Sequence, residues 1–506
     1  MYKKLSKDAK MNNLPLFLDS TLKSSNRWIK LATLIPWDNI DDIYAKNFTS
    51  NSGPKALPSR MALGSLIIQI KLNLTDEETV NQITENPYLQ YFIGLRAFQD
   101  EPPFDASMMT HFRKRLNLQD IKNIDQILHN NHTKKKQKNR DSTSVSSDTN
   151  PLQNKGKLIV DASCAPADIQ YPTDLGLLNK AREKSELIID ILWKTRDNKE
   201  QKNKPRTYRK KGRRAFVKIL KQKSPSKKKV RSAINVQLCC LKRNFETIEN
   251  LKKHASLTTL GNSLYKDLLV INSLYQQQLE MYQQRKHSVK DRIVSISQPH
   301  IRPIVRGKAG AKTEFGAKFS ISVIDGWNFL DTVSFDAYNE GKELIAQIEK
   351  YKERLGFYPK SVHADKIYRN QTNRKFCKEN GIRLSGPKLG RPTKDIKKRT
   401  EQKIQEYADE GARNIVEGRF GIGKRRYGLD KIMTKLKATS ETVIALIFMV
   451  MNLDGVTHFL GSFYKKTIYY SHVIRTVIKL IGKIEMRSAN QPHKIEKFYG
   501  ILGTYS

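Results

Sequence analysis

Cysteine is scarce in this sequence. Four of the 506 residues are cysteines, and none belongs to a Cys-x-x-Cys pair or to a histidine cluster at zinc-finger spacing. The sequence therefore predicts neither a disulfide framework nor a structural zinc site, and a reducing compartment suits it best.

Long hydrophobic runs are missing as well. The longest, residues 443–453, falls well short of the roughly 20 residues that span a bilayer. Near the basic N-terminus, the only apolar stretch, residues 14–18, is too short for a secretory signal. We expect a buried helix at 443–453, no membrane partner and a cytoplasmic protein.

Acidic residues are few beside basic ones. Asp and Glu number 50 against 92 Lys and Arg, which gives a net charge of +42. An excess of this size predicts a polyanionic partner, and nucleic acid is the commonest one. A ribosomal partner, a membrane surface, or charge that serves solubility alone are the alternatives. Charge does not indicate which reaction follows.

Residues 1–130 are predicted to form a helical domain. Apolar residues recur at helical spacing in 61–72 and 80–95, and Thr75 with Glu78 forms a Thr-x-x-Glu capping box. A third helix, with three adjacent bases, is predicted at 105–116. This pattern fits either a helix-turn-helix reader of DNA or a helical packing or dimerisation domain.

Composition marks the later boundaries. Residues 131–154 are almost free of apolar side chains and predict a disordered linker. The core is expected at 155–170 and 296–455, with a helical insertion at 171–295 and a basic helical tail at 456–506. Within the insertion, residues 194–231 hold 18 bases and two acids, which favours contact with DNA phosphates over a merely solvated loop. The bases singled out there are Arg209, Lys210, Lys211, Arg213 and Arg214.

Two short apolar strands in the core each end on an acid. Residues 157–160 lead into Asp161 and residues 360–364 into Asp365, and Glu417 lies on a predicted helix further along. Phosphoryl transfer on DNA uses two divalent ions, and magnesium is held by few protein carboxylates. Strand ends facing a helix supply the rigid placement that such a site needs. The three acids are therefore the predicted catalytic and metal-binding residues.

The other acids of the core have ordinary structural interpretations. Strands are predicted at 314–324 and 329–335, and Asp325 lies in the Asp-Gly turn between them, where its side chain bonds the backbone. A further strand is predicted at 382–385 and a long polar helix at 393–417. Loop, strand-end or helix-surface positions account for Asp168, Asp174, Asp331, Asp336, Glu406 and Glu410.

Three blocks of sequence surround the predicted catalytic acids. They read Val-Asp-Ala-Ser-Cys-Ala-Pro at 160–166, His-Ala-Asp-Lys-Ile-Tyr-Arg-Asn at 363–370, and Arg-Asn-Ile-Val-Glu-Gly-Arg-Phe at the start of 413–429. These blocks resemble the catalytic blocks of bacterial insertion-sequence transposases of the DDE class. Residues 36–116 also resemble the helical N-terminal domain of those proteins.

The resemblance implies an α/β fold, with an RNase H-like mixed-sheet catalytic core, a helical N-terminal domain and a helical insertion. The first acid is expected on the first strand, the second after the fourth strand, and the glutamate on a later helix. The implied reaction is hydrolysis at the element's ends, followed by attack of the freed 3′-hydroxyls on target DNA. Two Mg²⁺ ions, which Mn²⁺ can replace, are the implied cofactors.

The implied partners are double-stranded DNA, as terminal inverted repeats and as target, and a second copy of the chain in a synaptic dimer. On DNA, the protein is expected to associate with the bacterial nucleoid. Two alternatives stay open: a catalytically inactive DNA-binding relative, and an RNase H-like nuclease without strand transfer.

Many relatives show Tyr, two residues, Arg, three residues, Glu, six residues, Lys. Arg413, Glu417 and Lys424 match the last three positions, whereas Glu410 stands where the Tyr would be. Because Arg and Lys bind phosphate, Arg413 and Lys424 are expected to hold the transposon-end backbone beside the metals. Further candidates for DNA contact, with helix-surface solvation as the alternative for the first two, are Lys366, Arg369, Arg419, Arg425 and Arg426.

Overall fold

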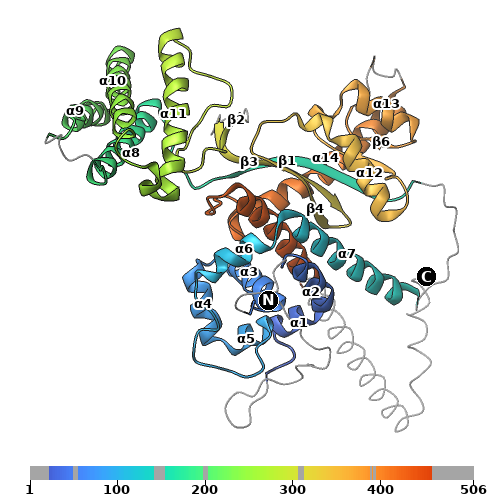
Figure 1. Cartoon of the computed structure of the whole chain (residues 1–506). Coiled ribbons are helices and arrows are strands. Elements are labelled where there is room, and N and C mark those ends of the chain that lie inside the picture. The colour runs from blue at the N-terminus through green and yellow to red at the C-terminus, as the bar shows by residue number, and fades with distance from the viewer. Residues whose placement is uncertain are drawn as a thin grey trace, which may run out of the picture.

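The computed structural model describes residues 22–48, 55–141, 154–197, 203–305, 313–387, 390 and 395–457. The expected tail at 456–506 therefore lies almost wholly outside the described residues. As Figure 1 shows, the N-terminal part is helical throughout its described length. Its helices are α1 (Arg27–Leu34), α2 (Trp37–Ala45), α3 (Ser59–Leu72), α4 (Asp76–Glu85), α5 (Pro87–Ile93), α6 (Met108–Arg115) and α7 (Leu118–Asp141).

Capping residues explain where these helices begin. The Thr75 hydroxyl accepts a hydrogen bond from the backbone N–H of Glu78, as the capping box predicts. The single helix expected at 80–95 is two helices, because Asn86 has extended backbone and Pro87 starts a new helix. Proline disfavours helical backbone in the residue before it and is well suited to a first helical turn.

The expected linker begins later than predicted. Helix α7 continues to Asp141, so the prediction of disorder was wrong for residues 131–141. A helix that is already nucleated gains one hydrogen bond for each added residue. Residues 142–153 lie outside the described part of the chain.

A mixed sheet forms the centre of the core. Its order is β2-β3-β1-β5-β6, and β4 also pairs with β3. Strand β1 is antiparallel to β3 and parallel to β5, which is parallel to β6. The bounds are β1 (Lys157–Pro166), β2 (Arg302–Val305), β3 (Thr313–Ile324), β4 (Trp327–Ser334), β5 (Ser361–His363) and β6 (Arg383–Leu384). The expected α/β fold class, with helical N-terminal domain and insertion, is confirmed.

The predicted hairpin is present between β3 and β4. Asp325 and Gly326 have φ angles of 49° and 87°, which are the left-handed conformations that a two-residue turn of this kind requires. Strand β2, four residues that include a proline, was not predicted. If β2 is left out of the count, Asp161 is on the first strand and Asp365 follows the fourth, as the resemblance implies.

Helices cover both faces of the sheet. On one face, the Phe319 ring packs against Phe420 of α14 (Ile396–Arg426) and against Phe448. On the other, Gln347 of α12 (Leu344–Leu355) donates to Asp331, which also accepts from Ser322. A shorter helix, α13 (Gln371–Glu379), lies between β5 and β6 in the chain.

Phe448 belongs to the last described helix, Lys437–Thr457. By length and composition alone this helix could cross a membrane, but 83% of its most apolar stretch is buried inside the protein. The buried helix expected at 443–453 is therefore confirmed as part of the core.

The insertion has its own apolar centre. It comprises α8 (Asp174–Lys194), α9 (Arg209–Leu220), α10 (Lys227–Leu251) and α11 (Gly261–Gln284). Leu178, Leu241 and Ile271 are fully buried among these helices. Figure 1 shows the insertion in green at one end of the sheet, joined to the core through β1, β2 and β3.

Candidate active site and DNA interface

The three predicted catalytic acids come from three different elements. Asp161 lies in the middle of β1, opposite Ile321 of β3, because the strand continues five residues beyond it. The expectation that it ends the strand was wrong. Asp365 follows β5 and caps the short helix η3 (Lys366–Tyr368), where its carboxylate accepts from the Lys366 N–H at 2.6 Å. Glu417 lies on α14.

Arg413 links two of these acids. One guanidinium nitrogen lies 3.1 Å from the Asp365 carboxylate and the other lies 3.5 Å from the carboxylate of Glu417, one helical turn away. The acid side chains are 52% and 58% exposed. Both carboxylates can therefore be reached from solvent, with one positive charge between them.

Asp161 lies in the negative field of its neighbours. Burial and, to a lesser extent, the charges of Glu340, Asp365 and Glu417 together raise the pKa of the Asp161 carboxyl to about 6, against a lowering by the Ala162 N–H, which donates at 2.8 Å. Ionisation of Asp161 is thus disfavoured in the protein alone. A cation close to all these carboxylates would reverse that cost.

The donor set fits magnesium, since carboxylate oxygens are the hard ligands that this ion prefers. Among the residues that the structure describes, however, no three acids, histidines or cysteines are close enough together to be recognised as a metal site. The guanidinium of Arg413 lies between two of the acids instead. A divalent ion at these two carboxylates would compete with the Arg413 guanidinium for them.

Glu340 is a fourth acid that the sequence reasoning missed. It lies in the short helix η2 (Glu340–Lys342), 2.7 Å from the ammonium of Lys318 on β3, and its charge acts on Asp161. No apolar strand leads into Glu340, so the pattern that singled out Asp161 and Asp365 could not find it. Only tertiary structure brings it near the site.

The predicted DNA-contacting bases near Glu417 are spread over several positions. Lys424 follows Glu417 by seven residues and so lies on the same side of α14. Arg419 donates to the Gly326 carbonyl at 3.2 Å, and Arg369 donates to the Pro387 carbonyl at 2.5 Å, so both have intramolecular partners. Exposed to solvent are Lys366, Arg425 and Arg426.

In the insertion, the five predicted bases all lie on α9, and all five are exposed. Lys210, Lys211, Arg213 and Arg214 are exposed, which is the arrangement that contact with a phosphate backbone needs. Arg209 differs, because it donates to the Asp190 carboxylate at 2.8 Å. Its charge is already paired within the insertion.

A buried arginine lies under this basic helix and orients it. Arg182 of α8 is 1% exposed and donates to Glu186, to Asn179 and to Gln237, whose own amide donates to the Gly212 carbonyl. A Cβ at Gly212 would meet the Arg182 side chain at 2.7 Å. The glycine within Lys-Lys-Gly-Arg-Arg therefore lets α9 lie directly on Arg182 with its bases turned outward.

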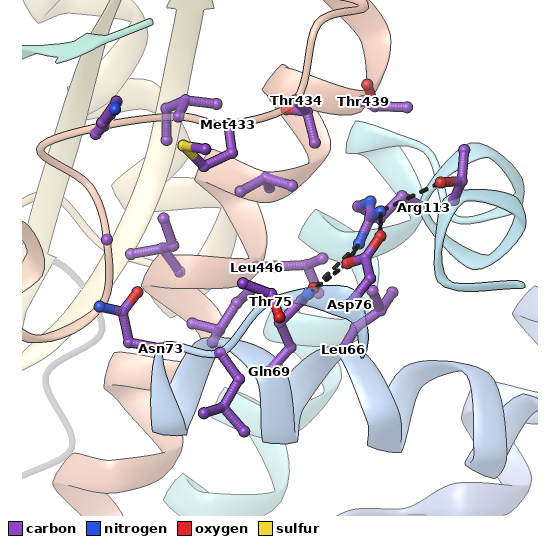
Figure 2. Close-up of a pocket in the computed structure, with 18 of the residues that line it drawn as sticks. Leu66, Gln69, Asn73, Thr75, Asp76, Arg113, Met433, Thr434, Thr439 and Leu446 are labelled. Carbon is purple, nitrogen blue, oxygen red and sulfur yellow. Dashed lines mark hydrogen bonds and ion pairs between the residues drawn. The ribbon is translucent and has the colours of Figure 1, made fainter. Parts of the chain in front are cut away.

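The N-terminal domain meets the C-terminal part of the core around a cavity of about 810 Å³. Figure 2 shows Arg113 of α6 bonded there to Asp76 at the start of α4, with distances of 2.9 and 2.5 Å. Arg115 lies over the Phe48 ring. Two of the three bases on α6 thus serve contacts within the protein, which weakens the helix-turn-helix interpretation.

Comparison with known proteins gives two family matches. A model described as a transposase DDE domain matches residues 362–454, which include Asp365 and Glu417. A model described as a transposase domain matches residues 16–115. A relative from Rhizobium meliloti, the uncharacterised protein ORF8 in the nfe locus, is 31% identical over 164 residues, or 32% of this chain and 73% of that protein. No solved structure matches the chain. With these two domains in one chain and that relative, the protein belongs to the insertion-sequence transposases.

Proposed function

We propose that this transposase cuts DNA at the ends of its insertion sequence and joins the freed 3′-hydroxyls to target DNA. Asp161, Asp365 and Glu417 are the catalytic carboxylates of the proposal. The observation that carries it is that Arg413 contacts Asp365 and Glu417, while β1, which contains Asp161, pairs directly with β5, which leads into Asp365.

Each side chain has a role that its position supports. Two Mg²⁺ or Mn²⁺ ions held by the three carboxylates would activate the attacking oxygen and stabilise the leaving oxygen of the phosphoryl transfer. Asp161, whose pKa the charges of both other acids raise, would hold the ions together with Asp365 and Glu417. Arg413 is placed to transfer its guanidinium from these acids to an arriving DNA phosphate.

The basic surfaces are proposed to hold the DNA. The exposed bases of α9 face solvent without an acidic partner of the kind that engages Arg209, and Arg425 with Arg426 extends the basic surface beyond Glu417. Double-stranded DNA, as element ends and target, is the proposed substrate. A synaptic dimer and a cytoplasmic, nucleoid-associated location belong to the same proposal and rest on the family.

A strand-transfer assay tests this function. Cutting is measured on an uncut element end and joining on a pre-cut end with a free 3′-hydroxyl, both with the sequence of the inverted repeats flanking the gene. Wild type should join the pre-cut end to plasmid DNA in Mg²⁺, while Asp161→Ala, Asp365→Ala and Glu417→Ala should bind the DNA without joining or cutting. Cutting without joining would indicate a nuclease, and binding alone an inactive relative. If one of these variants keeps near-normal cleavage, the acid that it replaces is not a catalytic residue.

A further inference from the structure

We infer that Asp409 is a positioning residue, which sets the separation of Asp365 and Glu417 by fixing α14 on the sheet. The inference rests on the proposed function, since it concerns the same acids. It starts from a buried polar cluster that the catalytic roles above do not use, the Asp409 cluster, formed by Asp409, Gln405, Arg383 and His363.

Asp409 is held from three sides. Its side chain is 6% exposed, and its two oxygens accept from the two terminal nitrogens of Arg383 on β6 at 2.6 and 2.9 Å. Gln405, one turn earlier on α14, donates to it at 3.0 Å. The ring of His363, at the end of β5, lies 3.6 Å away and is bonded on its far side to Ser361 at 3.0 Å.

The cluster is joined to both exposed acids by short covalent paths. His363 precedes Asp365 by two residues, and Asp409 precedes Glu417 by eight, with Arg413 midway. Residues four apart on a helix share a face, so Asp409, Arg413 and Glu417 form one row directed at the β5 edge. The first member of the row binds β6, the second binds Asp365, and the third is the catalytic acid.

The packing of α14 gives this contact particular weight. In the described part of this helix, the buried residues are Asp409, Val416, Phe420 and Gly423. Among the residues of α14 that precede the segment 413–417, all of which the structure describes, Asp409 is thus the only buried side chain, and upstream of it Ile404 and Tyr407 are 64% and 74% exposed. The N-terminal side of the catalytic segment is therefore held on the sheet through Asp409.

A bidentate arginine pair fixes angle as well as distance. An apolar residue in the place of Asp409 could bury a similar area, but it would allow α14 to slide or rotate, and buried ionic groups can specify such a register. Loss of the pair should therefore change the relation of Glu417 to Asp365 more than it changes the fold.

Mn²⁺ affinity, measured by electron paramagnetic resonance on the full-length protein without DNA, reports this relation directly. Asp409→Asn keeps the size of the side chain and removes its charge, and it should weaken Mn²⁺ binding about tenfold or more, as loss of outer-shell partners does elsewhere. Arg383→Lys keeps the charge, loses the bidentate geometry and should weaken binding in the same direction. This milder variant keeps the test valid if Asp409→Asn does not fold.

Asp76→Asn is the matched control, because Asp76 forms the same kind of bidentate pair with Arg113 in the N-terminal domain. It should lower the melting temperature and leave Mn²⁺ affinity unchanged. An Asp409→Asn variant with wild-type affinity, or with a loss no larger than that of Asp76→Asn, overturns the inference. If Asp365→Asn also binds Mn²⁺ like wild type, the proposed metal site itself is wrong.

Discussion

Replacing Asp161 with Asn is expected to stabilise the catalytic core while it abolishes activity. Burial, with the charges of Glu340, Asp365 and Glu417, raises the pKa of Asp161 from 3.8 to about 6. A carboxyl whose pKa is higher in the folded than in the unfolded protein opposes folding when it ionises. The cost is absent below pH 3.8, grows up to about pH 6 and stays constant above.

The size of the effect follows from the shift. One pKa unit corresponds to about 1.4 kcal/mol, so a shift of about two units gives at most about 3 kcal/mol at pH 8. Asn cannot ionise, and its side-chain oxygen can still accept from the Ala162 N–H. The variant should therefore avoid the free-energy cost of ionising residue 161 in the folded protein and keep the hydrogen bond from the Ala162 N–H.

Thermal melting in EDTA between pH 4 and pH 8 measures the difference. The variant and the wild type should melt together at pH 4, and the variant should melt at the higher temperature at pH 8. Adding Mg²⁺ at pH 8 should raise the melting temperature of the wild type and narrow the gap. Asp365→Asn is the control and should gain no stability, because its carboxylate is exposed and loses Arg413.

Equal melting temperatures across the whole range would refute this reasoning. So would a wild type that becomes more stable relative to the variant as the pH rises, because the sign would then show that the protein favours the ionised form of Asp161 without a metal.

Other perturbations separate the remaining roles. Neutralising Lys210, Lys211, Arg213 and Arg214 together should weaken binding to every DNA sequence. The slope of log affinity against log salt concentration should become less steep by roughly 0.9 for each lost phosphate contact. Arg209→Gln, whose guanidinium is engaged by Asp190, should leave that slope nearly unchanged. Arg413→Ala and Lys424→Ala should change the melting temperature little, because exposed ion pairs contribute about 0.2 to 1 kcal/mol. Both variants should slow cleavage by the equivalent of about 2 to 5 kcal/mol. If melting temperature and cleavage rate fall in proportion, these residues serve the fold and not the reaction. Arg113→Ala should destabilise the N-terminal domain by about 3 kcal/mol, since it leaves Asp76 without its partner, and DNA binding by the folded fraction should persist in a gel-shift assay.

Local pattern was enough to predict most of the elements. The Asp325-Gly326 turn, the Thr75 cap and the apolar spacing of α3 each depend on residues close together in the chain. At Asp161, a distant partner decided the outcome. The strand predicted to end on Asp161 continues to Pro166, because β3, some 150 residues later, pairs with residues 162–166.

The same limit applies to the candidate site. Asp161, Asp365 and Glu417 could be singled out because strands, helix periodicity and family blocks mark them in the sequence. Glu340 and Asp409 carry no such mark, since what distinguishes them is a contact with Lys318 and with Arg383 respectively. Their importance follows from sheet topology, which brings separate strands and α14 to one edge.

The length of β1 affects how far a DNA segment bound to the insertion would lie from Asp161. Beyond Asp161, β1 stays paired with β3 as far as Pro166 opposite Gly316, where a Cβ would collide with the Ala165 carbonyl, and β2 continues the pairing on the other side of β3. The chain thus enters and leaves the insertion through strands of the sheet that contains Asp161. If a DNA duplex binds along α9, the distance between that contact and Asp161 would be fixed by the sheet. The insertion would then determine which phosphodiester bond of the duplex reaches the catalytic acids.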